Sequence, residues 1–568
     1  DVALQPPVHG NRHMTSSGHL LATQAGYEIF EAGGNAIDAG VAAGIALAVV
    51  HSEMVQFAGV APIMIYLAER DEVVTISGLG PWPRAATIER FIDEYGGQIP
   101  HGVLRTVVPS APDAWLLALS KFGTLSFGEV AAPAIGFARD GFPMHHVMRD
   151  YIVAHKDDYA RWPENAAIYL PGGEVPKVGA RFVQTDLAQT MQFMADEEAS
   201  ARASGGRSAG LEAARDAFYR GDIADRIVAV QREHGGWLDH EDLASYRSAI
   251  EAPVRTAFKG VDVYACGPWC QGPALSQTLS LLDGFDLQGM GHNEAAYIHH
   301  IVEATKLAFA DREAYYGDPR HVDVPLDRLL AAEYTAAQCS RIDPLHAAPG
   351  LPPPGLDPAS EPLLNATKGA PGASADTSYV CTVDTAGNLF SATPSDVSWE
   401  APIVPGTGIS PSTRGSQSWA MRGHASAVSP GKRPRLTPNP AIAIAPGRYA
   451  MPFGTPGGDN QTQAMLQVLL NLHVFGMPVQ EAIEAPRFMC HSFPNSFEPH
   501  AYFPDKVTVE GRVETEVTDT LAAMGHDVER LEDITYKTAG VCAIVRDPET
   551  GLLEGGADPR RMSRAMGR

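Results

Sequence analysis

The chain has 568 residues, with 43 basic against 67 acidic side chains and a formal net charge of −24 at pH 7. This excess of negative charge repels phosphate backbones and anionic lipid, so it argues against a nucleic-acid partner and against binding to a membrane surface. A chain of this length forms either several domains or one large layered unit, and we expect an enzyme that acts on a small molecule.

The six cysteines are sparse, and only Cys266 and Cys270 lie close together in the sequence. No second pair and no histidines at zinc-site spacing accompany them, so we expect no metal, no cofactor and no disulfide framework. Sparse cysteines favour the cytoplasm slightly. A periplasmic or secreted location is the alternative if a signal peptide has been removed, because the chain does not begin with Met.

The first predicted elements are two helices in "GHLLATQAGYEIFEAGGNAIDAGVAAGIALAVVH". One ends near Glu31, before the glycine stop at Gly33 and Gly34, and the next covers the apolar tract 36–50. This tract is too short for a bilayer and contains Asp38, so it predicts a buried helix. Paired strands are expected next, at residues 63–67 and 73–77.

The middle of the chain is predicted to be mostly helical. Residues 114–242 contain helical patches broken by Pro and Gly, and longer helical patterns follow at 274–282 and 295–315. Residues 349–372 then hold seven prolines and four glycines among 24 residues. This composition predicts an exposed, irregular linker, which we extend to residue 376.

Two hairpin-like units follow the linker. The first, "TSYVCTVDTAGNLFSAT", has strands at 377–383 and 389–393, and the second, "AIAIAPGRYAMPFG", leads into a helical pattern at 463–472. A strand at 507–509, a helix at 514–524 and the hairpin "GVCAIVRDPETGLLEGGADPR" complete the chain. Because strands and helices come in clusters, the pattern favours a layered sandwich of sheets and helices over a doubly wound parallel sheet.

Thr377 is the candidate nucleophile because it stands where the loose linker meets a strand. A threonine hydroxyl needs a neighbouring base. Cleavage between Asp376 and Thr377 would supply one, since the freed α-amine has a reference pKa of about 7.7 to 8.0 and could accept the hydroxyl proton. The alternative interpretation is a threonine at an ordinary strand start.

Two other stretches could serve a nucleophile. In "FGTPGGDNQTQ", Gly457 and Gly458 precede a helical pattern, so their N–H groups could hold an oxyanion, although two glycines also suit an ordinary turn. In "PGKRPRLTPNPAI", the basic cluster that includes Arg435 could bind a carboxylate or simply pair with acidic side chains. Arg414, in "SPSTRGSQSW", presents the same choice.

Seven motifs in order resemble the gamma-glutamyltransferase family of N-terminal nucleophile hydrolases. They are "EAGGNAIDAGVAAGIALAVVH", "FADREAYYGDP", "DTSYVCTVDTAGN", "PGKRP", "GTPGGD", "EAIEAPRF" and "GGADPRR". The resemblance implies an α+β fold, a four-layer αββα sandwich, in a precursor that cleaves itself. Residues 1–376 would form a large subunit ending in linker 349–376, and residues 377–568 a small subunit carrying the nucleophile. A homo-oligomer of such heterodimers is compatible with this expectation.

The resemblance also assigns the site. The family's nucleophile falls on Thr377, its supporting hydroxyl falls on Ser395, and the oxyanion glycines fall on Gly457 and Gly458. Thr377 Oγ would attack the Asp376 carbonyl, and water would open the resulting ester. The second hydroxyl is a Ser where the family has Thr, an exchange that keeps a donor and an acceptor.

The substrate pocket departs from the glutathione enzymes of the family. Leu79 replaces their carboxylate-binding Arg, Val397 replaces an Asn, and Leu436 and Thr437 replace two serines. This pattern resembles the divergent branch that includes amidohydrolases of small acyl amides, such as oxamate amidohydrolase. The expected substrate-binding positions are therefore Leu79, Val397, Trp399, Arg414, Arg435 and Thr437, with the two arginines as a relocated carboxylate clamp.

The leading prediction is a self-processing amide hydrolase or acyltransferase that works through an acyl-enzyme on a small-molecule amide. One alternative is genuine γ-glutamyl transfer or glutathione hydrolysis with an altered pocket. Another is an unprocessed binding protein without catalysis.

Overall fold

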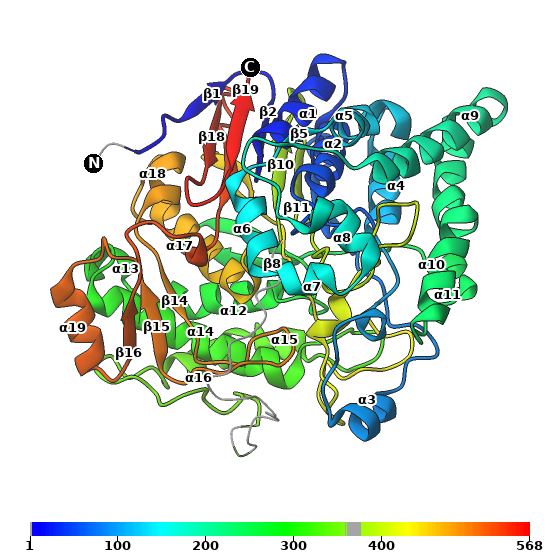
Figure 1. Ribbon diagram of the computed structural model, residues 1–568. Coiled ribbons are helices and arrows are strands. Elements are labelled where there is room, and N and C mark those ends of the chain that lie inside the picture. Colours follow the sequence, from blue (N-terminus) through cyan, green and yellow to red (C-terminus); the bar gives the residue numbers. More distant parts are fainter. Residues whose placement is uncertain (1–2, 358, 360–376) are drawn as a thin grey trace.

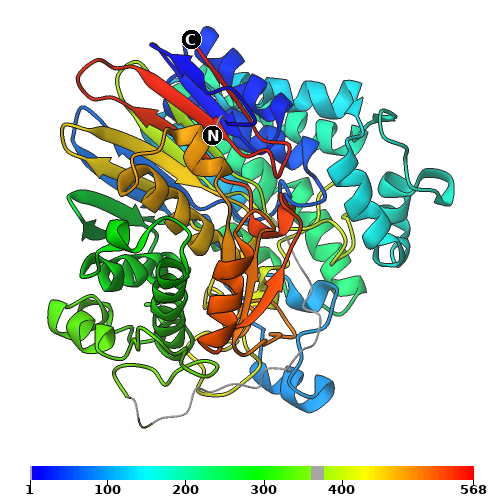
Figure 2. The same cartoon turned by 90° about the vertical axis from the view of Figure 1, so that its left-hand side faces the viewer.

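The computed structural model describes residues 3–357, 359 and 377–568. Asp376 and most of the predicted linker therefore lie outside the described residues. Two seven-stranded sheets lie face to face, and each is covered by helices on its outer side (Figures 1 and 2). The order of layers is helix, sheet, sheet, helix, which confirms the predicted α+β fold of the αββα type.

Both sheets take strands from both ends of the chain. In spatial order, sheet A contains β1 (Val8–Gly10), β18 (Leu553–Ala557), β17 (Cys542–Arg546), β13 (Tyr449–Gly454), β12 (Ala441–Ala445), β9 (Val261–Ala265) and β8 (Val254–Phe258). Sheet B contains β19 (Arg564–Gly567), β2 (Met14–Ser17), β10 (Val380–Val383), β11 (Leu389–Ala392), β3 (Ile63–Leu67), β4 (Glu72–Ile76) and β7 (Ile250–Glu251). Each sheet thus combines strands that precede residue 358 with strands that follow residue 376.

The space between the sheets is a narrow apolar core. Side chains that alternate along the strands meet there, since successive residues of a strand point to opposite faces. Tyr379 and Cys381 on the nucleophile side face Ile442, Cys542 and their neighbours on sheet A. The sheets are held together by burial of these side chains, and β10 and β11 pack directly on β13 and β17.

Two larger cores lie outside the sheets. Helices α1 (Leu20–Glu31), α2 (Ala36–Val50), α4 (Ala111–Phe122), α5 (Phe127–Asp140) and α9 (Thr185–Tyr219) cover sheet B. Helices α12 (Gly272–Asp283), α14 (Ala295–Tyr315), α17 (Gln461–His473) and α18 (Val479–Glu484) cover sheet A. The helices predicted at 36–50 and 295–315 are confirmed with the same bounds.

The remaining helices and strands lie outside the two large sheets. The other helices are α3 (Ile88–Tyr95), α6 (His146–Ala154), α7 (Lys156–Ala160), α8 (Pro163–Tyr169), α10 (Asp222–Glu233), α11 (His240–Ser245), α13 (Leu287–Met290), α15 (Leu326–Leu329), α16 (Ala332–Cys339) and α19 (Thr515–Ala523). Strands β14 (Phe488–Cys490), β15 (Lys506–Val509) and β16 (Asp527–Arg530) form a small sheet, and β5 (Phe142–Pro143) pairs with β6 (Arg181–Phe182). None of the helices in the described ranges is long and apolar enough to cross a membrane.

Helix α2 lies directly on the strands that carry the candidate nucleophile. Its first turn is fixed by a capping box, in which Asn35 accepts N–H groups of the helix while Asp38 accepts the N–H of Asn35. Small residues along the helix then allow a close approach to the sheet. At Gly40, an added Cβ atom would lie 2.2 Å from Cδ1 of the buried Phe390 ring on β11.

Gly40→Ala should therefore destabilise the protein, by about 1 to 3 kcal/mol, because the helix must move away from Phe390. The matched control is Gly136→Ala in α5, where nothing lies within 4 Å of the added Cβ. That change should stabilise the protein by roughly 0.4 to 1 kcal/mol, because alanine lowers the conformational entropy of the unfolded chain. Unfolding of the two variants in denaturant measures both effects, and equal behaviour would contradict this account of the interface.

Candidate active site

Thr377 and Ser395 face one another at the ends of adjacent strands. Their side-chain oxygens lie 2.7 Å apart, and both residues are almost completely buried. The two residues form an isolated antiparallel bridge, and the Ser378 N–H donates to Pro394 O at 3.1 Å. The regular strand starts only at Val380, so the prediction of a strand beginning at residue 377 was three residues too early.

Ser395 is held on its other side by the loop that precedes β3. Its N–H donates to Val60 O at 3.0 Å, in a second isolated bridge. Ser395 thus lies between the start of β10 and the loop that precedes β3. These backbone contacts fix the position of the Ser395 backbone relative to Thr377.

Arg414 brings a buried positive charge to this pair. One of its terminal nitrogens donates to Ser395 Oγ, and its Nε lies 3.5 Å from a carboxylate oxygen of Asp396. The guanidinium group also lies over the Phe497 ring, with Cζ 5.1 Å from the ring centroid. Of the two arginines predicted to clamp a carboxylate, Arg414 is the one beside the candidate nucleophile.

Asp396 orients Arg414. Its carboxylate accepts hydrogen bonds from Ser412 Oγ at 2.8 Å and from the Thr413 N–H at 3.0 Å. Asp396 has a φ of +112°, a conformation that is strained for a residue with a side chain. Burial raises the pKa of this carboxyl, and the positive charge of Arg414 opposes that rise. The backbone strain and the buried charge pair place the side chain where it fixes the arginine.

Gly457 and Gly458 lie in the turn between β13 and α17. Both have positive φ, +120° and +56°, which favours glycine at these positions. A Cβ added to Gly458 would lie 3.5 Å from the Phe497 ring, the same ring that lies beneath Arg414. Phe497 therefore connects the glycine turn to the Thr377 side of the site.

Gln271, which sequence reasoning missed, ties two predicted positions together. Its side-chain amide nitrogen donates to Thr437 O and to Gly458 O, both at 2.9 Å. Thr437 Oγ1 in turn accepts from the Gln417 side chain at 2.8 Å. Neither Gln271 nor Phe497 belongs to a recognisable motif, so only their positions in the fold reveal them.

Arg435 is engaged elsewhere. It donates two hydrogen bonds of 2.9 Å to the Glu313 carboxylate and one of 2.8 Å to Arg312 O. Burial alone would raise the pKa of Glu313, but the charges of Arg435 and Arg312 hold it well below its ordinary value. This buried ion pair accounts for Arg435, so its predicted role as a substrate ligand gains no support from the geometry.

The remaining predicted substrate positions are buried. Leu79 belongs to the apolar core between the sheets, and Val397 belongs to the core beneath α2. The Trp399 ring stacks on His155, with centroids 3.8 Å apart and an interplanar angle of 9°. Their contacts with a substrate stay predictions.

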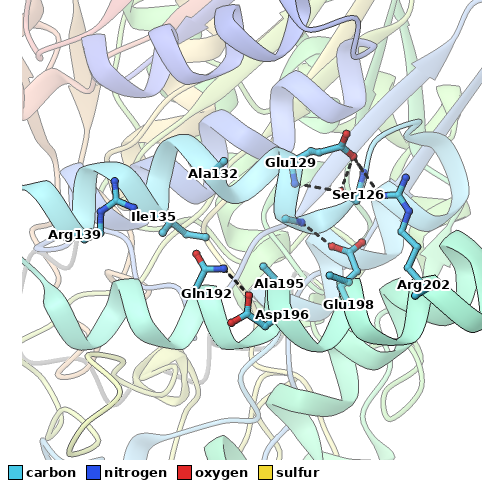
Figure 3. A pocket seen from close by; sticks show the side chains of 13 residues that line it. Ser126, Glu129, Ala132, Ile135, Arg139, Gln192, Ala195, Asp196, Glu198 and Arg202 are labelled. Carbon is cyan, nitrogen blue, oxygen red and sulfur yellow. Dashed lines mark hydrogen bonds and ion pairs between the residues drawn. The ribbon is translucent and has the colours of Figure 1, made fainter.

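One cavity lies beside the glycine turn, and a larger one lies away from the site. One of about 400 Å³ opens beside Gly457 and is lined by basic side chains that include Lys506, Lys537 and Arg561. A larger one, of about 690 Å³, lies between α5 and α9 (Figure 3). There the Glu198 carboxylate already accepts the Phe127 and Gly128 N–H groups at the start of α5, which is a structural role.

Comparison with known proteins matches the "Gamma-glutamyltranspeptidase" family model to residues 22–568. The chain belongs to this family. The family resemblance is thereby confirmed, and the protein is an enzyme, a self-processing amidohydrolase of the N-terminal nucleophile type.

The relatives of this protein within the family are named for different substrates. The chain is 31% identical over 567 residues to the glutathione hydrolase-like YwrD proenzyme of Bacillus subtilis strain 168, covering 99% of each chain. It is 31% identical over 566 residues to the oxamate amidohydrolase proenzyme of Klebsiella pneumoniae, covering 98% of each. A crystal structure of cephalosporin acylase from Bacillus halodurans matches with a TM-score of 0.86 and 28% identity, covering 100% of this chain and 98% of that one.

Glu498, next to Phe497, makes the stability of this region pH-dependent. Burial raises the pKa of its carboxyl to about 7. A raised pKa means that the folded protein binds this proton more tightly than the unfolded chain does. The stabilisation is complete below about pH 4.5 and is lost as the pH rises through about 7.

Glu498→Gln mimics the protonated acid and should remove this loss. We expect its gain in unfolding free energy over the parent protein to be about 2 kcal/mol larger at pH 8 than at pH 5. Denaturant unfolding at the two pH values measures the difference. A gain that does not change with pH would show that Glu498 is ionised in the folded protein at both.

Proposed function

We propose that Thr377, freed by cleavage of the Asp376–Thr377 bond, is the nucleophile of an amidohydrolase whose substrate carries a carboxylate on its acyl group. The observation that carries the proposal is the 2.7 Å contact between Thr377 Oγ1 and Ser395 Oγ, with Arg414 donating to the same serine. A nucleophile, a hydroxyl partner and a cation thus converge just before the start of β10. The cation suits an anionic acyl group.

In this mechanism the new α-amine of Thr377 takes the proton from its own Oγ as that oxygen attacks the amide carbonyl. The N–H groups of Gly457 and Gly458 stabilise the oxyanion. The protonated amine then gives its proton to the leaving amine, and the C–N bond breaks to leave an ester on Thr377. Water, activated by the same amine, hydrolyses the ester and releases the acid.

Cleavage would divide the chain into residues 1–376 and 377–568, as its relatives' description as proenzymes suggests. The two parts share both sheets, because β10 and β11 lie between β2 and β3 while β12 lies beside β9. Separating the parts would break strand pairs in the middle of each sheet. We therefore expect large and small subunits that remain together after cleavage.

The proposed acyl group is small and anionic rather than γ-glutamyl. Leu79 and Val397 are buried apolar residues at positions where the glutathione enzymes have polar ligands, so an amino acid head group would find fewer partners. Arg414 brings a positive charge to Ser395, the hydroxyl partner of Thr377. Glutathione hydrolysis is the competing function, since one relative is named as glutathione hydrolase-like.

Thr377→Ala should leave the 60.6 kDa chain intact. The parent protein should give two bands of about 40 and 20 kDa, in proportion to the lengths of the two parts. A denaturing gel and the N-terminal sequence of the smaller band make the measurement. Thr377→Ser, which keeps the hydroxyl, is the matched control and should still be cleaved. Cleavage of the Ala variant at the same bond would overturn the assignment of Thr377.

Arg414→Leu should lower kcat/KM for anionic acyl amides roughly 10- to 100-fold more than for neutral ones, since a charge-assisted hydrogen bond contributes about 1.5 to 3 kcal/mol. Matched substrates are oxamate with oxamide and glutaryl anilide with pentanoyl anilide. Arg414→Lys keeps the charge and should retain most of the preference. Equal losses on both members of each pair, or efficient turnover of a γ-glutamyl anilide, would contradict the proposed specificity.

A further inference from the structure

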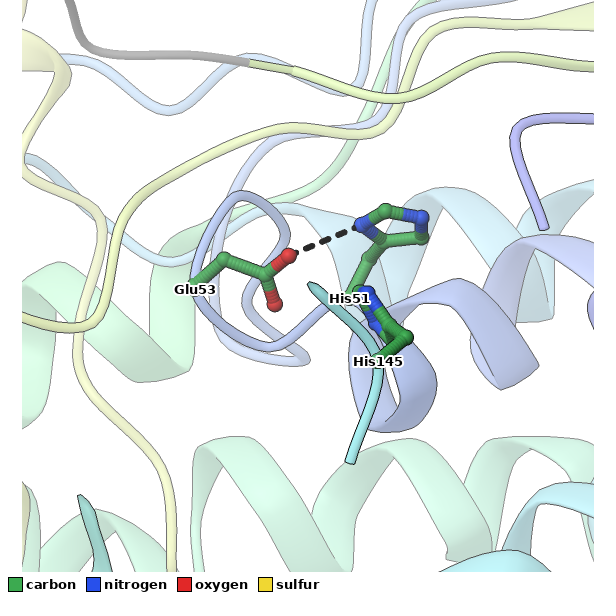
Figure 4. Close-up of side chains that lie close together, drawn as sticks. All are labelled: His51, Glu53 and His145. Atoms are coloured by element: carbon green, nitrogen blue, oxygen red, sulfur yellow. Dashed lines mark hydrogen bonds and ion pairs between the residues drawn. The ribbon is translucent and has the colours of Figure 1, made fainter. Parts of the chain in front are cut away.

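His51, Glu53 and His145 form a buried cluster that the proposed reaction does not use. His51 caps the C-terminus of α2, Glu53 follows in the next turn, and His145 caps the N-terminus of α6. In Figure 4 the three side chains turn toward one another. One ligand atom from each lies within 4.8 Å of the others, and the Glu53 side chain is completely buried.

The contacts of His51 leave a place for a cation beside Glu53. Its Nε2 lies 3.2 Å from Gly18 O and its Nδ1 lies 3.0 Å from Glu53 Oε1, so both ring nitrogens face oxygen acceptors. A neutral imidazole has only one N–H. Once Nε2–H donates to Gly18 O, the lone pair of Nδ1 faces a carboxylate oxygen. Either a proton or a metal ion must lie between them.

The surroundings favour a metal ion. Glu53 Oε2 is buried without a hydrogen-bond partner, and among the described residues the only ion-pair partner of Glu53 is His51. Nδ1 of His145 accepts a backbone N–H, so its imidazole is neutral, as a metal ligand must be. A proton shared with His51 would leave Oε2 unsatisfied, whereas a metal ion can bind it.

Each of the two imidazoles has one ring nitrogen against a backbone carbonyl, an arrangement that is common for histidines that bind metals. Nε2 of His51 lies on Gly18 O, and Nε2 of His145 lies 2.8 Å from Val50 O, which leaves Nδ1 of each ring for a metal. Nδ1 of His145 accepts the Met148 N–H at 3.1 Å, so the ion would replace this one hydrogen bond. The rings of His51 and His145 are 4.9 Å apart.

A second cluster of the same residue types lacks these features. At His299, Glu303 and His526, the Lys306 ammonium lies 2.9 Å from Glu303 Oε1, and the Ala348 N–H donates to Oε2 at 3.1 Å. Glu303 therefore has its cation and its hydrogen bonds within the chain. A metal ion there would meet the charge of Lys306.

We propose that His51 Nδ1, the Glu53 carboxylate and His145 Nδ1 bind a divalent transition metal ion of the zinc class. Two imidazoles and a carboxylate are typical zinc ligands, with water in the fourth position. Binding displaces the proton between His51 and Glu53 into solvent. The ion would brace the turn at Gly18, whose N–H donates to Tyr379 O at 3.0 Å, two residues from Thr377.

The test is metal content of the full-length protein after incubation with Zn²⁺ or Co²⁺ and dialysis. We expect about one tightly held equivalent, and a Co²⁺ spectrum without the charge-transfer band of thiolate ligands. Glu53→Gln and His145→Asn should lose this equivalent, while the control His299→Asn should keep it. Thr377→Ala should also keep it, so failure of the proposed reaction would leave the metal site standing.

Three results would overturn the site. They are no retained metal in the parent protein, equal loss in His299→Asn, and retention in Glu53→Gln. The first would show that the cation between His51 and Glu53 is a proton. Because the Co²⁺ spectrum and stoichiometry come from the parent protein, the test does not depend on whether the variants fold.

Discussion

The contact between Thr377 and Ser395 depends on a junction that the rest of the fold maintains. Ser395 is bound through its backbone to the start of β10 on one side and to Val60 on the other. Its hydroxyl is fixed by Thr377 and by Arg414, which Asp396 orients from a strained backbone conformation. Charges and hydroxyls are held in position here because they are removed from water and have specific partners.

Buried ion pairs hold the arginines around this junction in place. The chain is acidic overall, yet Arg414 and Asp396 are paired in its interior, as are Arg435 and Glu313. Pairs of this kind add little net stability relative to an apolar core, but removing one partner leaves a costly unpaired charge. They therefore fix orientation. Arg435 is bound by Glu313, whereas Arg414 is bound by Asp396 and also donates to Ser395 beside Thr377.

The interleaving of strands connects folding with the proposed cleavage. Each sheet combines strands from before and after the linker, so the precursor must fold before its backbone is cut. After cutting, the paired strands and the apolar core between Tyr379, Ile442 and their neighbours would hold the two parts together. The freed residue would then be a chain end on a rigid support, which is what a nucleophile of this kind requires.

The sequence alone indicated the family, the αββα fold and local helices such as α2 and α14, because residue preferences and turn residues act over short distances. It also located the hydroxyl pair and the glycine turn through their motifs. Tertiary structure decided which of two similar arginines lies beside Thr377 and Ser395, since the partner of Arg435, Glu313, lies 122 positions away in the sequence. It also brought Gln271 and Phe497 to the site and placed His145 beside His51 and Glu53, from which it is separated by more than 90 positions. Contacts between distant segments leave no periodic trace along the chain, so only the packed fold reveals them.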